Sequence, residues 1–123
     1  MVAFKSMGIT CADSVQEAIS DANLVLSCLF DDASVLETTT GAKGVLHHLP
    51  KNACYVSTET MLPKTIEQLW QIFQDAQKQY LPAAILGGPK EVATGKTTVF
   101  TSGNTSANQR YETILKLFTE QIC

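Results

Sequence analysis

Two kinds of residues in this sequence could bind phosphates or metal ions, and a glycine-rich stretch is the first. Residues Gly88–Thr97 contain Gly-Lys-Thr, the triplet with which a P-loop holds nucleotide phosphates. A P-loop has about four residues between its first glycine and this triplet, whereas six residues separate Gly88 from Gly95. Lys96 also leads into a β-rich segment, so no helix N-terminus would face a phosphate. We therefore reject a P-loop.

Cysteine and histidine side chains are the second kind. The four cysteines show no C-x-x-C pair, and Cys28 and Cys54 fall inside apolar segments. This predicts small buried hydrophobic residues in a reducing compartment, with a catalytic or metal-binding role as the alternative. His47 and His48 are adjacent, so their side chains point apart on a helical turn, and no carboxylate or cysteine stands at ligand spacing. We expect no metal site.

The composition predicts one globular domain. The 123 residues are 45% hydrophobic and 17% charged, and the net charge is −3. Lysine and arginine are scattered, which argues against a surface for nucleic acid or an anionic membrane. No apolar run approaches the ~18 residues needed to span a bilayer, and the N-terminus lacks the pattern of a signal peptide. We expect a cytoplasmic protein without nucleic-acid or membrane partners.

The most apolar stretch, Asn23–Phe30, predicts a strand buried on both faces, as found inside parallel sheets. The carboxyl end of such a strand borders the crevice in which α/β proteins bind ligands, and Asp31 and Asp32 follow it there. Further strands are predicted at Ala53–Ser57, Pro82–Leu86 and Thr97–Thr101, with a short edge strand at Ile9–Cys11.

Helical patterns lie between these strands. Ser14–Glu17 fits a capping box, and Asp31 offers an N-cap to the next helix. Pro63 suits the first turn of a long helix whose apolar stripe runs from Ile66 to Tyr80, and a last stripe runs over Tyr111–Ile122. The order predicts an α/β fold with three parallel strands, one further strand, and helices on both faces.

Six short pieces of the sequence stand in a fixed order: Gly8-Ile9 with Ser14–Ala18, Ala22–Asp31, Gly41–Leu46, Ser57-Thr58 with Pro63, Gly87–Gly95, and Gly103. Together they resemble the middle of the cofactor domain of the β-hydroxyacid dehydrogenases. That family includes hydroxyisobutyrate dehydrogenase, phosphogluconate dehydrogenase and imine reductases. Asn23 stands where the family usually has Asp, and one extra residue precedes Pro63.

The resemblance implies a Rossmann-like half-domain that works with NADP or NAD in hydride transfer to or from a small hydroxy acid, aldehyde or imine. By position it implies cofactor contacts from Leu29, Phe30, Asp31, Val35, Ser57 and Thr58, and substrate contacts from Leu86, Gly87 and Gly88. Core packing is the alternative for Leu29 and Val35. Helix-cap chemistry at a strand end is the alternative for Ser57 and Thr58.

The sequence also departs from the family's pattern. No Gly-x-Gly-x-x-Gly turn occurs, so we expect residues 1–123 to form a single partial domain without the glycine-fingerprint half. The family's catalytic lysine lies in a later helical domain that is also absent, so the chain alone is expected to be inactive. Leu86 replaces a substrate-binding serine, and Pro82-Ala83-Ala84 replaces Asp-Ala-Pro. Leu86 cannot hydrogen-bond a carboxylate, which favours an imine-reductase-like or divergent member over one that acts on simple hydroxy acids.

A different class of function is the alternative: a non-catalytic oligomerising or binding module on a decayed Rossmann half. Without the first strand of the fold, Asn23–Phe30 would become a sheet edge, and an exposed apolar edge is a template for pairing. This predicts a homo-oligomer that covers the 23–30 strand, or residues 2–11 pairing over it.

Overall fold

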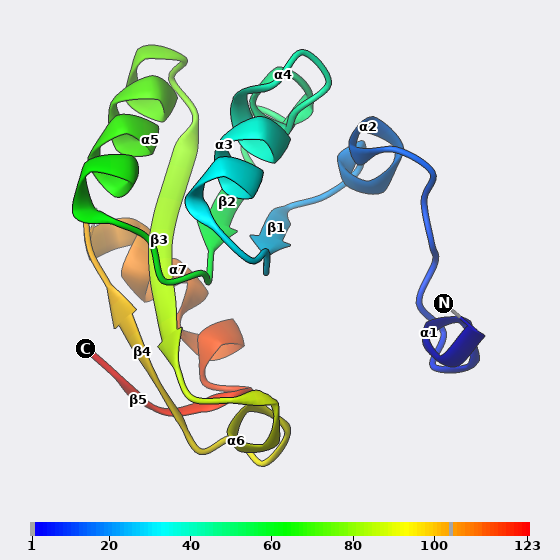
Figure 1. Cartoon of the computed structure of the whole chain (residues 1–123), viewed down its shortest axis with the longest axis vertical. Helices are drawn as coiled ribbons and strands as arrows, with labels where there is room; N and C mark the ends of the chain where they lie inside the picture. Colours follow the sequence, from blue (N-terminus) through cyan, green and yellow to red (C-terminus); the bar gives the residue numbers. More distant parts are fainter. Residues whose placement is uncertain (1, 104) are drawn as a thin grey trace.

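The computed structural model describes residues 2–103 and 105–123, in which one sheet runs through the molecule (Figure 1). The strands lie side by side in chain order: β1 (Leu24–Ser27), β2 (Cys54–Ser57), β3 (Gln79–Leu86), β4 (Thr97–Thr101) and β5 (Thr119–Ile122). β1, β2 and β3 are parallel, β4 is antiparallel to β3, and β5 is parallel to β4. The predicted α/β class and the three parallel strands are confirmed, and β5 is an additional strand.

The helices cover both faces of this sheet. The helices that contribute to the two cores are α2 (Val15–Ile19), α3 (Asp32–Thr40), α4 (Val45–His48), α5 (Pro63–Asp75) and α7 (Thr105–Leu115). Within the described part of the chain, the short helices α1 (Val2–Ser6) and α6 (Pro89–Ala93) contribute to neither core. Successive residues of β2 point to opposite faces, so Tyr55 packs in one core with α2 to α5, and Val56 packs in the other with α7. Figure 1 shows α5 and α7 on opposite sides of β3.

Two predicted helical stripes end earlier than expected. α5 ends at Asp75, Gln77 adopts a left-handed backbone with φ of 55°, and Tyr80 lies in β3. α7 ends at Leu115, and Ile122 lies in β5. The hydroxyl of Thr119 donates to the backbone oxygen of Thr97 at 2.6 Å, one of the contacts that join β5 to β4.

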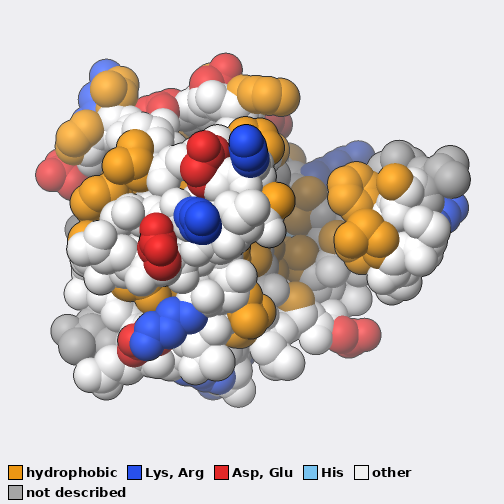
Figure 2. Space-filling view, turned by 90° about the horizontal axis from the view of Figure 1, so that it is seen from below, with side chains coloured by type: hydrophobic (Ala, Val, Ile, Leu, Met, Phe, Trp, Pro, Cys, Tyr) orange, Lys and Arg blue, Asp and Glu red, His pale blue; other side chains and the backbone are white. Residues whose placement is uncertain are grey.

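The N-terminal segment also differs from expectation. Residues Ile9–Cys11 form no strand, and α1 stands apart from the sheet in Figure 1. Figure 2 shows this segment as a separate lobe with hydrophobic side chains on its surface, and Phe4, Met7 and Ile9 are exposed. Residues 2–11 therefore do not pair with β1, which forms one edge of the sheet.

The strand at this edge is less buried than its composition predicts. The regular strand covers only Leu24–Ser27, and 48% of Leu26 is exposed. Cys28 is exposed, contrary to expectation, whereas Cys54 is buried and desolvation raises its pKa to about 11. The sequence of β1 is typical of a strand inside a parallel sheet, but β1 has a neighbouring strand on one side only.

Candidate functional site

The carboxyl ends of β1 and β2 are joined by a buried chain of polar groups. The hydroxyl of Thr39 donates to the hydroxyl of Tyr55 (3.3 Å), which lies 2.7 Å from Ser27 Oγ. Ser27 Oγ donates to Glu59 Oε2 at 3.0 Å, and the amide of Leu29 donates to Glu59 Oε1 at 2.9 Å. Since Glu59 is only 7% exposed, both of its carboxylate oxygens are used to hold the loop that follows β1.

Ser57 and Thr58 are buried and bonded to neighbouring strands. Ser57 Oγ lies 2.8 Å from the hydroxyl of Tyr80, and Thr58 Oγ1 donates to the backbone oxygen of Ser27 at 2.6 Å. Burial raises the pKa of Tyr80 to about 12, so this phenol stays neutral at physiological pH. Neither hydroxyl caps a helix, because α5 begins only at Pro63. Both side chains stabilise the strand ends in this structure.

The loop after β1 contains the other predicted cofactor contacts. Phe30 is 103% exposed, whereas Leu29 is half-buried against the core. Asp31 caps α3: its Oδ1 accepts from the amide of Ser34 at 2.8 Å, and hydrogen bonding from Ser34 lowers the pKa of this carboxyl. Val35 is fully buried in the core, as the core-packing alternative expects, so its side chain is not presented to a ligand.

The predicted substrate contacts lie at the carboxyl end of β3. Leu86 is 65% exposed there. Gly87 has φ of 146°, and a Cβ at this position would lie 2.9 Å from Thr97 Cγ2, so a side chain would be both strained and crowded. The amide of Gly88 donates to Glu91 Oε2 at 2.9 Å within the first turn of α6.

One exposed apolar side chain stands at or after the carboxyl end of each parallel strand. Phe30 follows β1, Leu62 follows β2 and is 55% exposed, and Leu86 ends β3. Exposed apolar side chains at the carboxyl ends of parallel strands suit the planar rings of a dinucleotide. This region does not suit the pyrophosphate, because the N-terminus of α3 is already capped by the Asp31 carboxylate.

Glu59 and Tyr55 were not predicted as members of this site. Their roles depend on burial next to Ser27, which is 32 residues from Glu59 and 28 residues from Tyr55 in sequence. The sequence feature that could have indicated Glu59 is its charge, two residues after the buried strand that ends at Ser57. The carboxyl end of such a strand borders the ligand crevice.

No group of three or more His, Cys, Asp or Glu side chains within the described residues is placed to hold a metal ion. Every helix in residues 2–103 and 105–123 is too short or too polar to cross a bilayer.

Solved structures share this fold. "Psf3 in complex with NADP+ and 2-OPP" superimposes with a TM-score of 0.93 at 20% identity, over 98% of this chain and 43% of that chain. Mycobacterium tuberculosis 3-hydroxyisobutyrate dehydrogenase with L-serine gives 0.84 at 20% identity, over 91% of this chain and 38% of that chain. An imine reductase from Pseudomonas sp. gives 0.79 at 25% identity, over 98% and 41%.

Sequence comparisons also find proteins similar to this chain. An "uncharacterized oxidoreductase YfjR" of Bacillus subtilis is 30% identical over 115 residues, which are 94% of this chain and 40% of that protein. The cytokine-like nuclear factor N-PAC of Danio rerio is 27% identical over 90 residues, 73% of this chain and 20% of that protein. The chain thus spans two fifths or less of these curated relatives. Residues 1–123 match the family model of the NAD binding domain of 6-phosphogluconate dehydrogenase, and the chain belongs to this family.

Proposed function

We propose that the chain forms the part of an NAD(P)-dependent oxidoreductase that contacts the planar rings of the dinucleotide. The enzyme would transfer hydride to or from a small hydroxy acid, aldehyde or imine; the reduced nicotinamide would supply the hydride, or the oxidised nicotinamide would accept it. The observation that carries this proposal is the exposure of three apolar side chains, Phe30, Leu62 and Leu86, at the carboxyl ends of three parallel strands. The family match over residues 1–123 supports it.

The residues of the chain would have positioning roles. Glu59 holds the amide of Leu29, which fixes the loop that carries Phe30. Gly87 keeps the backbone after β3 close to Thr97, and Leu86 offers an apolar contact. Because Leu86 cannot hydrogen-bond a carboxylate, we propose an imine or aldehyde substrate before a hydroxy acid. We assign no catalytic residue within the chain.

Replacing Phe30 by alanine is expected to weaken NADPH or NADH binding about fivefold, because the exposed ring would lose its contact with the cofactor. Isothermal calorimetry on the 123-residue chain measures this, and we expect a Kd weaker than about 1 μM for the parent chain. Phe100→Ala, which removes a half-exposed ring from β4, is the matched control. Equal affinity of Phe30→Ala and the parent chain would contradict the role of Phe30.

Catalysis by the chain alone is tested separately. Steady oxidation of NADPH with an imine or aldehyde would contradict the expected inactivity of the 123-residue chain. A Kd tighter than about 1 μM would show that the cofactor site is more complete than proposed.

A second candidate function is association through β1. β1 has a neighbour only on the β2 side, and Leu26 is 48% exposed, so the strand can accept another strand at its free edge. The backbone oxygens of Asn23 and Ser27 accept from Cys54 and Thr58. Because strand residues alternate, Leu26 directs its backbone groups away from β2. We propose a homo-oligomer joined at this edge.

Leu26→Pro is expected to dissociate that oligomer, because it removes an amide from the free edge without removing a β1–β2 hydrogen bond. Leu26→Thr, which keeps the amide and loses apolar surface, should dissociate it less. Light scattering after size-exclusion chromatography measures both masses at about 50 μM, well above the Kd of a micromolar complex. A monomeric parent chain at that concentration would overturn this candidate function.

A further inference from the structure

A cavity of about 300 Å³ lies at the amino end of β3, at the opposite end of this strand from Leu86. Eight residues at ~3.3 Å each separate the two ends by roughly 23 Å. The cavity is therefore a different place from the exposed side chains of Phe30, Leu62 and Leu86. We call it the Trp70 cavity, after the side chain that forms one wall.

The pairing of β3 explains why this cavity exists. β2 pairs with Gln79–Pro82, the first half of β3, whereas β4 pairs only with Ala83–Leu86, the second half. The first half thus has no strand on its second side, and the cavity is lined there by α5, the following turn and the first turns of α7. Pro82 lies in this unpaired stretch, where its missing amide costs no ladder hydrogen bond.

The charges in the Trp70 cavity differ from those of the whole chain. Its lining includes two cationic side chains, Lys78 and Arg110, and no carboxylate, although the chain has a net charge of −3. Lys78 Nζ donates to the backbone oxygen of Leu46. Arg110 lies over the ring of Tyr111 at 5.4 Å, and within the described residues no carboxylate forms an ion pair with it. An anion would complete this arrangement.

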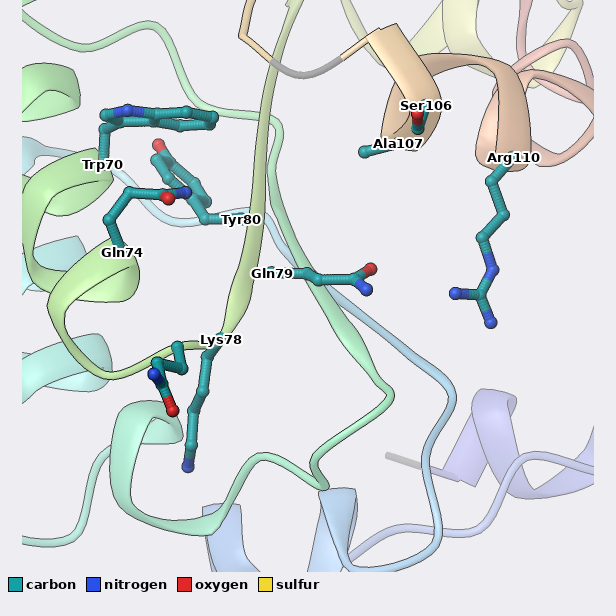
Figure 3. Close-up of a pocket in the computed structure, with 9 residues that line it drawn as sticks. Trp70, Gln74, Lys78, Gln79, Tyr80, Ser106, Ala107 and Arg110 are labelled. Carbon is teal, nitrogen blue, oxygen red and sulfur yellow. The ribbon is translucent and has the colours of Figure 1, made fainter.

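The aromatic and the polar side chains that line the Trp70 cavity lie in different parts of it. In Figure 3 the rings of Trp70 and Tyr80 lie on one side of β3, and the amide of Gln79 points away from them towards the guanidinium of Arg110 on the other side. Tyr80 is almost fully buried and its hydroxyl is bonded to Ser57, so it contributes its ring as a neutral wall. A ligand that fits both parts of the cavity needs a planar apolar part and an anionic part.

We propose that the Trp70 cavity binds a small aromatic carboxylate. The carboxylate would accept hydrogen bonds from Arg110 and from side-chain amides such as that of Gln79, and the ring would stack beside Trp70. This site is independent of the proposed cofactor surface, so its test contains no dinucleotide.

Trp70 is the only tryptophan of the chain, so its fluorescence reports on this cavity directly. Benzoate, added to the 123-residue chain up to about 10 mM, is expected to change the emission saturably with a Kd below about 1 mM. Benzamide keeps the ring without the charge, acetate keeps the charge without the ring, and both should bind at least about tenfold more weakly, which is ~1.4 kcal/mol.

Two variants test the site. Arg110→Gln should weaken benzoate binding at least about tenfold. Gln74→Glu should abolish binding by placing a carboxylate in the lining, whereas Gln68→Glu, an exposed position on α5 outside the cavity, should leave the Kd unchanged. The absence of a saturable change, equal Kd values for Arg110→Gln and the parent chain, or equal binding of acetate and benzoate would each overturn the proposal.

Discussion

Replacing Glu59 by alanine is expected to lower the free energy of unfolding by about 3 kcal/mol. The carboxylate is 7% exposed and accepts from Ser27 Oγ and from the amide of Leu29. Alanine would leave both donors without this acceptor at the end of β1, where Ser27 is also buried. The loss would extend to Tyr55 and Thr39, whose hydroxyls continue the same chain. Urea denaturation followed by circular dichroism measures the change.

Two further variants test whether the loss of stability comes from the hydrogen bonds of Glu59 and not from the removal of a carboxylate in general. Glu59→Gln keeps one acceptor oxygen, so it should lose less stability than alanine, about 1–2 kcal/mol. Glu67→Ala removes an exposed carboxylate from α5 and should change the free energy of unfolding by less than about 0.5 kcal/mol. A similar small loss for Glu59→Ala and Glu67→Ala would show that the buried network does not stabilise the fold.

The Glu59 variants also connect stability to the proposed function. Leu29 stands directly before Phe30, and its amide is fixed by Glu59 Oε1. A loop that has lost this bond would present the ring of Phe30 in several positions, and ordering it would then weaken cofactor binding. The network that joins β1 to β2 is thus also the support of the exposed Phe30.

The strands that carry strong local signals could be predicted from the sequence. β2, β4 and the second half of β3 consist of short runs rich in apolar and β-branched residues, and they lie where these runs predict them. The parallel order followed from the alternation of strands and helices. The edge position of β1 followed from the resemblance, since the neighbouring strand of the family has no counterpart in the chain.

The two wrong predictions of secondary structure, a helix that reaches Tyr80 and another that reaches Ile122, have a common physical cause. Tyr80 lies seven residues after Phe73, which continues a helical stripe, but the chain leaves the helix at Gln77 with a left-handed backbone that no glycine announces. β5 has only four residues, Thr119–Ile122, and owes its conformation to pairing with β4. Both depend on contacts between distant segments, which local spacing does not contain.

The candidate site was predictable as a region and less so as a set of side chains. The resemblance directed attention to the carboxyl ends of the strands, where Phe30 and Leu86 are exposed. It also directed attention to Ser57 and Val35, which are buried. Whether a strand-end residue faces a ligand or the core depends on its neighbours in space, and the sequence alone does not give them.

Phe73→Ala is expected to lower the free energy of unfolding by about 4 kcal/mol, because it leaves a cavity in the centre of the larger core. Phe73 is fully buried, and its ring forms a triangle with those of two tyrosines: the centroid of Tyr55 is 5.5 Å away, that of Tyr80 is 5.2 Å away, and the two tyrosine centroids are 5.7 Å apart. The tyrosine hydroxyls bond Ser27 and Ser57 at the ends of β1 and β2. The three rings therefore connect α5 to the strand ends that border the candidate site.

Phe73→Leu is the matched control for the ring itself. Leucine keeps most of the apolar volume and loses the stacking, so the expected loss is about 1–2 kcal/mol, and thermal denaturation should rank the variants parent, leucine, alanine. Near-ultraviolet circular dichroism should show weaker tyrosine signals in the alanine variant, because Tyr55 and Tyr80 would each lose the neighbouring ring of Phe73. Equal stability of the leucine and alanine variants would mean that the core closes around the smaller side chain, and that Phe73 is not needed to fix the two hydroxyls.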